Sequence, residues 1–174
     1  VNFRVINAFI PIFWTRELGT SPEQGSFALT VFFSIGIFMT YIGGLLGDKY
    51  GPIKIIRLSL LIWLPAMFLL TEVPTFSPVI MMPVAYLLLL MTGAAKAISY
   101  SPVIVLGQTY LAKSIGFASG ITLGVSQTIG GIIAPVVGNL ADTYTLPAAM
   151  MTLVPFLVVG LGASLILKDP KKLQ

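Results

Sequence analysis

The chain contains no cysteine and no histidine, and only 9% of its 174 residues are charged. The absence of cysteine excludes disulfide frameworks and thiol nucleophiles, and the absence of both residues excludes most zinc sites. A soluble domain is about one quarter charged. With 56% hydrophobic residues and a mean hydropathy of +0.97, the natural solvent of this chain is therefore lipid. The net charge of +4 is too small and too scattered for a nucleic-acid surface.

Six apolar stretches follow one another with short connections. They cover residues 1–14, 26–47, 52–71, 78–111, 115–141 and 146–167. As a helix, residues 26–47 would be about 33 Å long, which is enough to cross a bilayer core. We therefore predict an all-α polytopic membrane protein whose residues 1–174 form one six-helix bundle. The fourth stretch is so long that we expect it to protrude, tilt or bend near Pro83 or Pro102.

Basic residues gather on one side of the membrane if the six spans alternate in direction. That side holds Lys49, Lys54, Arg57, Lys113, Lys168, Lys171 and Lys172, the other holds Arg16, and Arg4 and Lys96 lie within spans. Because cytoplasmic loops carry an excess of lysine and arginine, the sequence predicts that the basic side and both ends of the chain are cytoplasmic. It predicts a multi-pass protein of the cell membrane.

The chain also repeats itself weakly. The stretch "GLLGDKYG" at 44–51 closes the second span, and "GNLADTYT" at 138–145 closes the fifth. Each combines a glycine, a leucine, a small residue, an aspartate and a tyrosine two places after the aspartate. Because the two spans run in opposite directions, this is the pattern of a three-plus-three inverted repeat, which is common in secondary transporters. Chance similarity between two apolar helix ends is the alternative.

The first of these stretches, "GGLLGDKYG", raises two structural expectations. Gly43, Gly44 and Gly47 would let the backbone of a neighbouring helix approach closely. Asp48 would stand at a helix C-terminus, where the helix dipole disfavours an anion. It therefore needs a partner: the N-terminus of another helix, or one of the basic groups Lys49, Lys54 and Arg57. A tight loop with a solvated salt bridge, worth about 0–1 kcal/mol, is the structural alternative.

This stretch resembles the cytoplasmic loop signature of the major facilitator superfamily. The matching positions are Gly44, Leu46, Asp48, Lys49, Gly51 and Lys54, whereas Pro52 and Ile53 replace a usual basic pair. The stretches "FIPIFW", "SPVIVLGQTYL" and "GFASGITLGVSQTIGGIIAPVVGNLAD" resemble the second half of fosmidomycin-resistance-type transporters. The resemblance implies six helices forming one half of the fold, a first span truncated at its start, and an absent N-terminal six-helix half as partner. It gives Asp48 the role of a bridge to that half. A half-size protein that works as a dimer is the alternative.

Small residues form a stripe along the fifth span, which favours close helix packing. The residues expected to pack are Gly116, Gly120, Gly124, Gly130, Gly131, Pro135 and Gly138, with Gln127 on roughly the same face. The stretch "GGIIAPVVGN" also resembles the antiporter motif of the same family, with Ala134 and Asn139 in place of two glycines. Helix packing is the first interpretation of the stripe, and exchange with protons is the second.

Polar groups inside spans are candidates for a substrate cavity, because unpaired burial in hydrocarbon is costly. The candidates are Arg4 and Asn7 on the first span and Thr92, Lys96, Ser99 and Tyr100 on the fourth. In the resembled fold, the first and fourth helices of each half line the central cavity. The alternative is that Arg4 and Lys96 extend to the membrane interface.

These features predict a secondary transporter that moves a small organic solute or drug, including fosmidomycin-like efflux. An uptake carrier for an organic anion or metabolite and an oligomeric pore are the alternatives. We expect no enzyme activity, cofactor, metal or nucleic-acid partner. Every aspartate and glutamate lies at a span end. Either an acid for proton coupling therefore lies in the absent N-terminal half, or the driving force is a different one.

Overall fold

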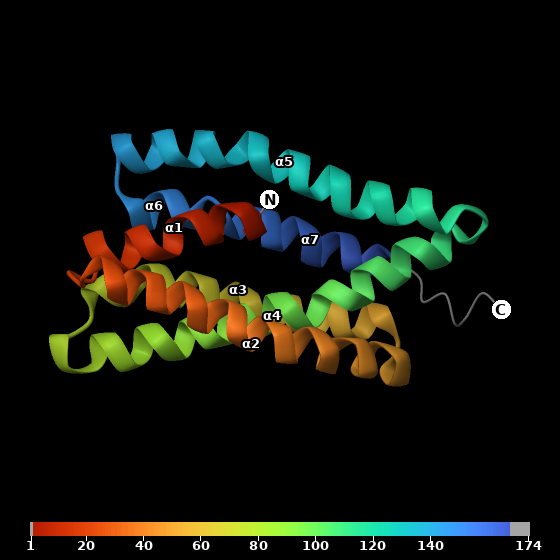
Figure 1. The fold of residues 1–174 in the computed structure, drawn as a ribbon, viewed down its shortest axis with the longest axis horizontal. Helices are drawn as coiled ribbons and strands as arrows, with labels where there is room; N and C mark the ends of the chain where they lie inside the picture. Colours follow the sequence, from red (N-terminus) through yellow and green to blue (C-terminus); the bar gives the residue numbers. More distant parts are fainter. Residues whose placement is uncertain (1, 168–174) are drawn as a thin grey trace.

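The computed structural model describes residues 2–167, with side chains from residue 5 onward, and Figure 1 shows that its regular elements are all helices. The elements are α1 (Asn2–Arg16), α2 (Pro22–Tyr50), α3 (Pro52–Glu72), η1 (Val73–Thr75), α4 (Pro78–Tyr110), η2 (Ala112–Ser114), α5 (Ile115–Thr143), α6 (Leu146–Met151) and α7 (Val154–Ile166). The all-α prediction is confirmed. The predicted basic tail residues Lys168, Lys171 and Lys172 lie outside the described residues.

Five of the six predicted spans are long and apolar enough to cross a membrane. They are Pro22–Tyr50, Pro52–Thr75, Pro78–Tyr110, Ala112–Thr143 and Leu146–Ile166. The first predicted span is α1, which has 15 described residues. At 33 residues, α4 is about 50 Å long and continues through Pro83 and Pro102 without a break. It is therefore longer than the core of a bilayer.

The helix of the second span is longer at both ends than the apolar stretch at residues 26–47. Its helix starts at Pro22 rather than at residue 26, because Ser21 caps it: the Ser21 hydroxyl accepts from the Gln24 N–H at 3.4 Å, and the Gln24 side chain accepts from the Ser21 N–H at 3.3 Å. It ends at Tyr50 rather than at residue 47. Gly51 alone makes the turn into α3, with a φ of +96° that favours glycine, and Pro52 then begins the next helix.

The sixth span is present, but it is not the continuous helix that the apolar stretch suggested. It is divided into α6 and α7, which are separated at Thr152 and Leu153. Pro155 has no N–H to donate to the carbonyl of Met151, four residues earlier, and so weakens the helix at this point. The Thr152 and Leu153 N–H groups instead donate to the carbonyls of Ala149 and Met150, at 3.2 and 3.0 Å, in a tighter turn.

The helix contacts follow the pattern of the predicted three-plus-three inverted repeat. In such a repeat, α1, α2 and α3 correspond to α4, α5 and the α6–α7 pair. Each contact between two helices should then have a counterpart between the two corresponding helices. The contact of α1 with α2 corresponds to that of α4 with α5, and the contact of α2 with α4 corresponds to that of α5 with α1. The contact of α3 with α4 likewise corresponds to that of α6 with α1. This is the contact pattern of two repeats of three spans related by inverted topology.

Successive helices run back and forth, so the connections alternate between two ends of the bundle (Figure 1). The α2–α3 and α4–α5 connections lie at one end, with Lys49, Lys54 and Lys113 in or beside them. The α1–α2, α3–α4 and α5–α6 connections lie at the opposite end, with Glu17 and Glu72 among their neighbours. The two ends of the bundle therefore differ in charge.

Candidate functional site

A cleft of about 630 Å³ opens among the helices. Its walls come mainly from α2, α4 and α5, with one residue each from α3 and α7. The lining residues are Phe33, Gly36, Ile37, Thr40, Trp63, Lys96, Ala97, Ser99, Tyr100, Val103, Ile104, Thr122, Leu123, Ser126, Gln127 and Phe156. The volume is in the range of small-molecule sites, and the mixture of apolar walls with a few polar groups is typical of them.

One face of α4 supplies the charged part of the cleft. Lys96, Ser99 and Tyr100, at i, i+3 and i+4, all line it. Thr92, one turn earlier on the same face, does not line it. Thr92 is 0% exposed, and its hydroxyl has no hydrogen-bond partner in the described part of the chain. The polar face of α4 therefore enters the cleft only from Lys96 onward.

Lys96 is half-buried, and its ammonium is positioned by an aromatic ring. The Nζ atom lies 5.3 Å from the centroid of the Phe32 ring, and Phe32 itself is 1% exposed. A cation over the face of an aromatic ring is attracted by the ring quadrupole. Phe32 also contacts Gly93 one turn before Lys96, where an added Cβ would lie 3.0 Å from the ring. The packing of α2 on α4 therefore fixes the ring beside the ammonium.

Four polar residues of the cleft were not predicted as cavity residues. They are Thr40 on α2 and Thr122, Ser126 and Gln127 on α5. Gln127 had been assigned to the packing stripe of the fifth span. The spacing of Thr122 and Ser126, at i and i+4, is the same signal that identified the polar face of α4. What the sequence alone does not show is that the two polar faces meet in one cleft.

The candidates on α1 are not among the residues that line this cleft. Asn7 is half-buried, and its Oδ1 atom has no hydrogen-bond partner in the described part of the chain. The side chain of Arg4 lies outside the described residues. The cleft is thus built by the second to sixth spans, and the predicted contribution of the first span to a cavity stays a prediction.

Close packing of α2 against α4 holds the polar face of α4 in place. A Cβ at Gly43 would overlap the backbone of Ile98, one at Gly44 would lie 3.2 Å from Ser101 Oγ, and one at Gly47 would lie 3.1 Å from Pro102 Cγ. The neighbouring helix that these glycines were expected to admit is therefore α4. Pro102 has no N–H to donate to the carbonyl of Ile98, and it is this carbonyl that Gly43 approaches.

The predicted loop motif forms the turn from α2 to α3. Gly51 makes the turn itself, Leu46 is half-buried, and Asp48, Lys49 and Lys54 are exposed at the end of the bundle. The Lys49 ammonium lies 5.1 Å from the centroid of the Tyr50 ring.

Arg57 lies one turn further along α3 and had been considered as a partner of Asp48. Its guanidinium instead donates to the carbonyl of Ser164 from Nε at 2.9 Å and from Nη2 at 2.6 Å. Arg57 therefore caps the C-terminal end of α7.

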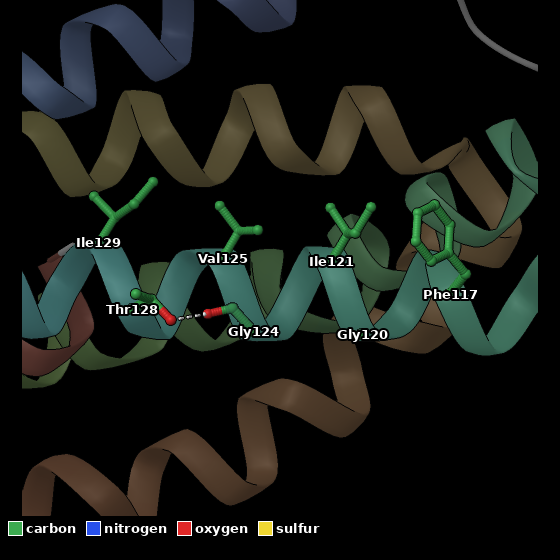
Figure 2. A pocket seen from close by; sticks show the side chains of 7 residues that line it. All are labelled: Phe117, Gly120, Ile121, Gly124, Val125, Thr128 and Ile129. Carbon is green, nitrogen blue, oxygen red and sulfur yellow. Dashed lines mark hydrogen bonds between the residues drawn. The ribbon is translucent and has the colours of Figure 1, made fainter.

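The glycine stripe of α5 is largely open in this chain. A Cβ at Gly116, Gly120, Gly124 or Gly131 would have no heavy atom within 4 Å, whereas Gly130 is buried and a Cβ at Gly138 would lie 3.8 Å from the Phe9 ring. Pro135 is exposed. Figure 2 shows Gly120 and Gly124 beside the side-chain row of Phe117, Ile121, Val125 and Ile129. These residues line a shallow groove whose volume is about 470 Å³. All residues that line this groove belong to α5.

Comparison with known proteins agrees with this architecture. The family model described as Major Facilitator Superfamily matches residues 1–174. The uncharacterized MFS-type transporter YfnC of Bacillus subtilis (strain 168) is 32% identical over 151 residues, which are 87% of this chain and 35% of that protein. The chain thus spans about a third of the length of this curated relative. No solved structure gives a significant match. From its helical repeat, its membrane-spanning segments and the match over its whole length, the chain belongs to the Major Facilitator Superfamily, whose members are membrane transporters and not enzymes.

Proposed function

We propose that the chain is part of a secondary active transporter that moves a small organic solute or drug by alternating access, and that the cleft is its solute site. The observation that carries the proposal is the origin of the cleft walls. They come from α2 and α3 of the first repeat and from α4, α5 and α7 of the second. A solute held between the two repeats is the arrangement that transporters of this kind use.

The proposed direction of transport is efflux, with fosmidomycin as the test drug. It is supported by the resemblance of this chain to fosmidomycin-resistance-type transporters. Uptake of an organic anion or metabolite is the second candidate, and the presence of Lys96 in the cleft favours it. Antiport is supported by the likeness of residues 130–139 to the antiporter motif. No carboxylate of the described residues lines the cleft, so a proton-coupling acid would come from another part of the transporter.

We further propose an N-terminal six-helix half as the partner of this chain. The curated relative is almost three times as long as the matched segment, and the stripe at Gly116, Gly120 and Gly124 is open to a neighbour. Because these residues are small, the backbone of a helix from the other half could approach the stripe closely. A second copy of the chain, in a half-size dimer, is the alternative occupant.

The proposed orientation places the basic end of the bundle in the cytoplasm of a cell whose membrane the protein spans. The support is the excess of lysine and arginine at the α2–α3 and α4–α5 connections. In this orientation Asp48 stands at the cytoplasmic end of α2. We assign it the role of a latch to the other half, because its loop resembles the superfamily signature in which the aspartate has that role.

The test uses the complete protein expressed in a fosmidomycin-sensitive bacterium. The parent should raise the inhibitory concentration of the drug, and Asp48→Asn should lower that resistance while leaving membrane abundance nearly unchanged. Glu72→Gln, at the opposite end of the bundle, is the matched control and should retain resistance. In liposomes, efflux should saturate and show counterflow. Flux that rises linearly without counterflow would instead support a pore.

A further inference from the structure

The charge lining the cleft has one sign. Of the described residues that line it, Lys96 alone is charged. The described acidic residues, Glu17, Glu23, Asp48, Glu72 and Asp142, are all absent from its walls and lie near the ends of helices. A cleft with apolar walls and one sign of charge concentrates the electric field and raises the local concentration of the opposite charge. The electrostatics of this cleft therefore favour an anion.

The hydroxyl groups of the cleft are mostly committed as donors. The hydroxyl of Thr40 donates to the carbonyl of Gly36 at 2.8 Å, that of Ser99 donates to the carbonyl of Lys96 at 2.9 Å, and that of Ser126 donates to the carbonyl of Thr122 at 2.6 Å. A hydroxyl carries one donor hydrogen, so these oxygens can only accept from a ligand. The ammonium of Lys96 combines three donors with a positive charge, and it is therefore the group of the cleft best suited to bind an anion.

The rest of the wall is apolar and rich in aromatic rings. Phe33 and Ile37 come from α2, Trp63 from α3, Val103 from α4 and Phe156 from α7. Trp63 is 7% exposed, and its indole N–H has no hydrogen-bond partner in the described part of the chain. A small inorganic anion would leave this surface uncovered, whereas an apolar body would displace water from it. The cleft is thus suited to a ligand with an apolar part as well as a charge.

We infer that the cleft selects organic anions that carry an apolar body, with the anionic group bound at Lys96 and the body against the aromatic wall. The inference rests on the proposed solute site and names its substrate class. The cation–π contact with Phe32 holds the ammonium at one place in the cleft. A charge fixed in advance loses less freedom when the ligand binds. Selectivity then comes from the charge of the ligand and not from its size alone.

The experiment measures ligand binding to the purified complete protein, by titration calorimetry and by thermal stabilisation. The probes share one skeleton and differ in charge: 3-phenylpropionate, the neutral 3-phenylpropanamide and the cationic 3-phenylpropylamine. Propionate, which has the charge without the ring, is the fourth probe. The parent should bind 3-phenylpropionate at least about tenfold more tightly than the amide or the amine, and propionate should bind more weakly than its phenyl derivative.

The variants assign this selectivity to one residue. Lys96→Met should remove the preference for the anion, and Lys96→Arg should retain part of it because the positive charge remains. Lys113→Met, which removes an exposed lysine outside the cleft, is the matched control and should bind as the parent does. If Lys96→Met does not fold, the probe series on the parent and on Lys96→Arg still decides the question.

Two results would overturn the inference. Equal binding of the anion, amide and amine by the parent, or no binding of any of them, would show that charge does not select the ligand. Unchanged anion preference in Lys96→Met would place the anion elsewhere. Saturable counterflow of fosmidomycin in liposomes is a separate readout. If counterflow is present and anion preference is absent, this inference fails while the proposed transport function stands.

Discussion

At the scale of single residues, Arg57 shows how a charge at the end of this bundle is used. Besides the two hydrogen bonds to the Ser164 carbonyl, its Nη2 group donates to the carbonyls of Leu165 and Leu167, both at 3.3 Å. The last carbonyls of a helix lack intrahelical donors, and the helix dipole favours a cation beside them. Arg57 thus joins α3 to the end of the last span, residues that are more than 100 positions apart in the sequence.

Replacement of Arg57 should therefore destabilise the bundle. We expect Arg57→Met to lower the free energy of unfolding by about 2 kcal/mol, because it removes charge-assisted hydrogen bonds to several carbonyls. Lys54→Met removes an exposed charge from the same helix and should change the value by less than about 0.5 kcal/mol. Unfolding of the complete protein in mixed detergent micelles measures both. Equal effects of the two substitutions would show that the α7 cap contributes nothing specific.

At the scale of helices, the contact of α2 with α4 determines where the polar face of α4 lies. Gly43 is the point of closest approach, since an added Cβ would overlap the backbone of Ile98. Gly36, two turns earlier on α2, has room: its Cβ would lie 4.0 Å from that of Ala97. The same substitution at Gly43 and at Gly36 therefore separates the effect of close α2–α4 packing from the general effect of replacing a helical glycine.

Gly43→Ala should lower the free energy of unfolding by about 1–3 kcal/mol, because backbone atoms must move to make room. Gly36→Ala should be neutral or stabilising by up to about 1 kcal/mol, from the higher helix propensity of alanine. Thermal unfolding of the complete protein provides the comparison. A loss at Gly36 equal to that at Gly43 would mean that propensity and lipid contacts, and not the α2–α4 approach, control this position.

The sequence predicts the helices better than it predicts their meeting points. Long apolar runs identify the spans because each span needs about 20 apolar residues. The helix ends differ from the ends of the apolar runs where a capping or turn residue sets them, as Ser21 and Gly51 do for α2. The break before α7 follows from Pro155, whose effect on the helix was not considered. The polar face of α4 was recognised from its spacing. The contribution of α5 to the cleft was not, because it depends on the packing of residues distant in the sequence.

At the scale of the whole molecule, the two ends of the bundle should face different compartments. The chain has no cysteine, so single cysteines can be introduced without background from this part of the protein. Cysteines at Tyr50 and Lys113 should react with an impermeant thiol reagent only from the cytoplasm, because these positions lie at the basic end. Cysteines at Pro74 and Thr143 should react only from outside. Reversal at any of the four positions would contradict the proposed topology.

The central claim is that the cleft opens to the two sides of the membrane in turn. Its most direct test is the labelling of Ser126→Cys in the complete protein, in oriented vesicles whose other cysteines are replaced. Ser126 lines the cleft from α5, and cysteine is close to it in size. The reagent is applied from one side or the other, with and without Asp48→Asn, which should shift the protein towards the inward-open state.

Alternating access predicts that the reagent reaches the cysteine from both sides and that the two labelling rates change in opposite directions. With Asp48→Asn, labelling from the cytoplasm should rise as labelling from outside falls, because the inward-open population grows at the expense of the outward-open population. Two rates that rise and fall together would indicate a continuous pore. No labelling from either side would show that the cleft is a packing defect of the bundle and not a site for solute.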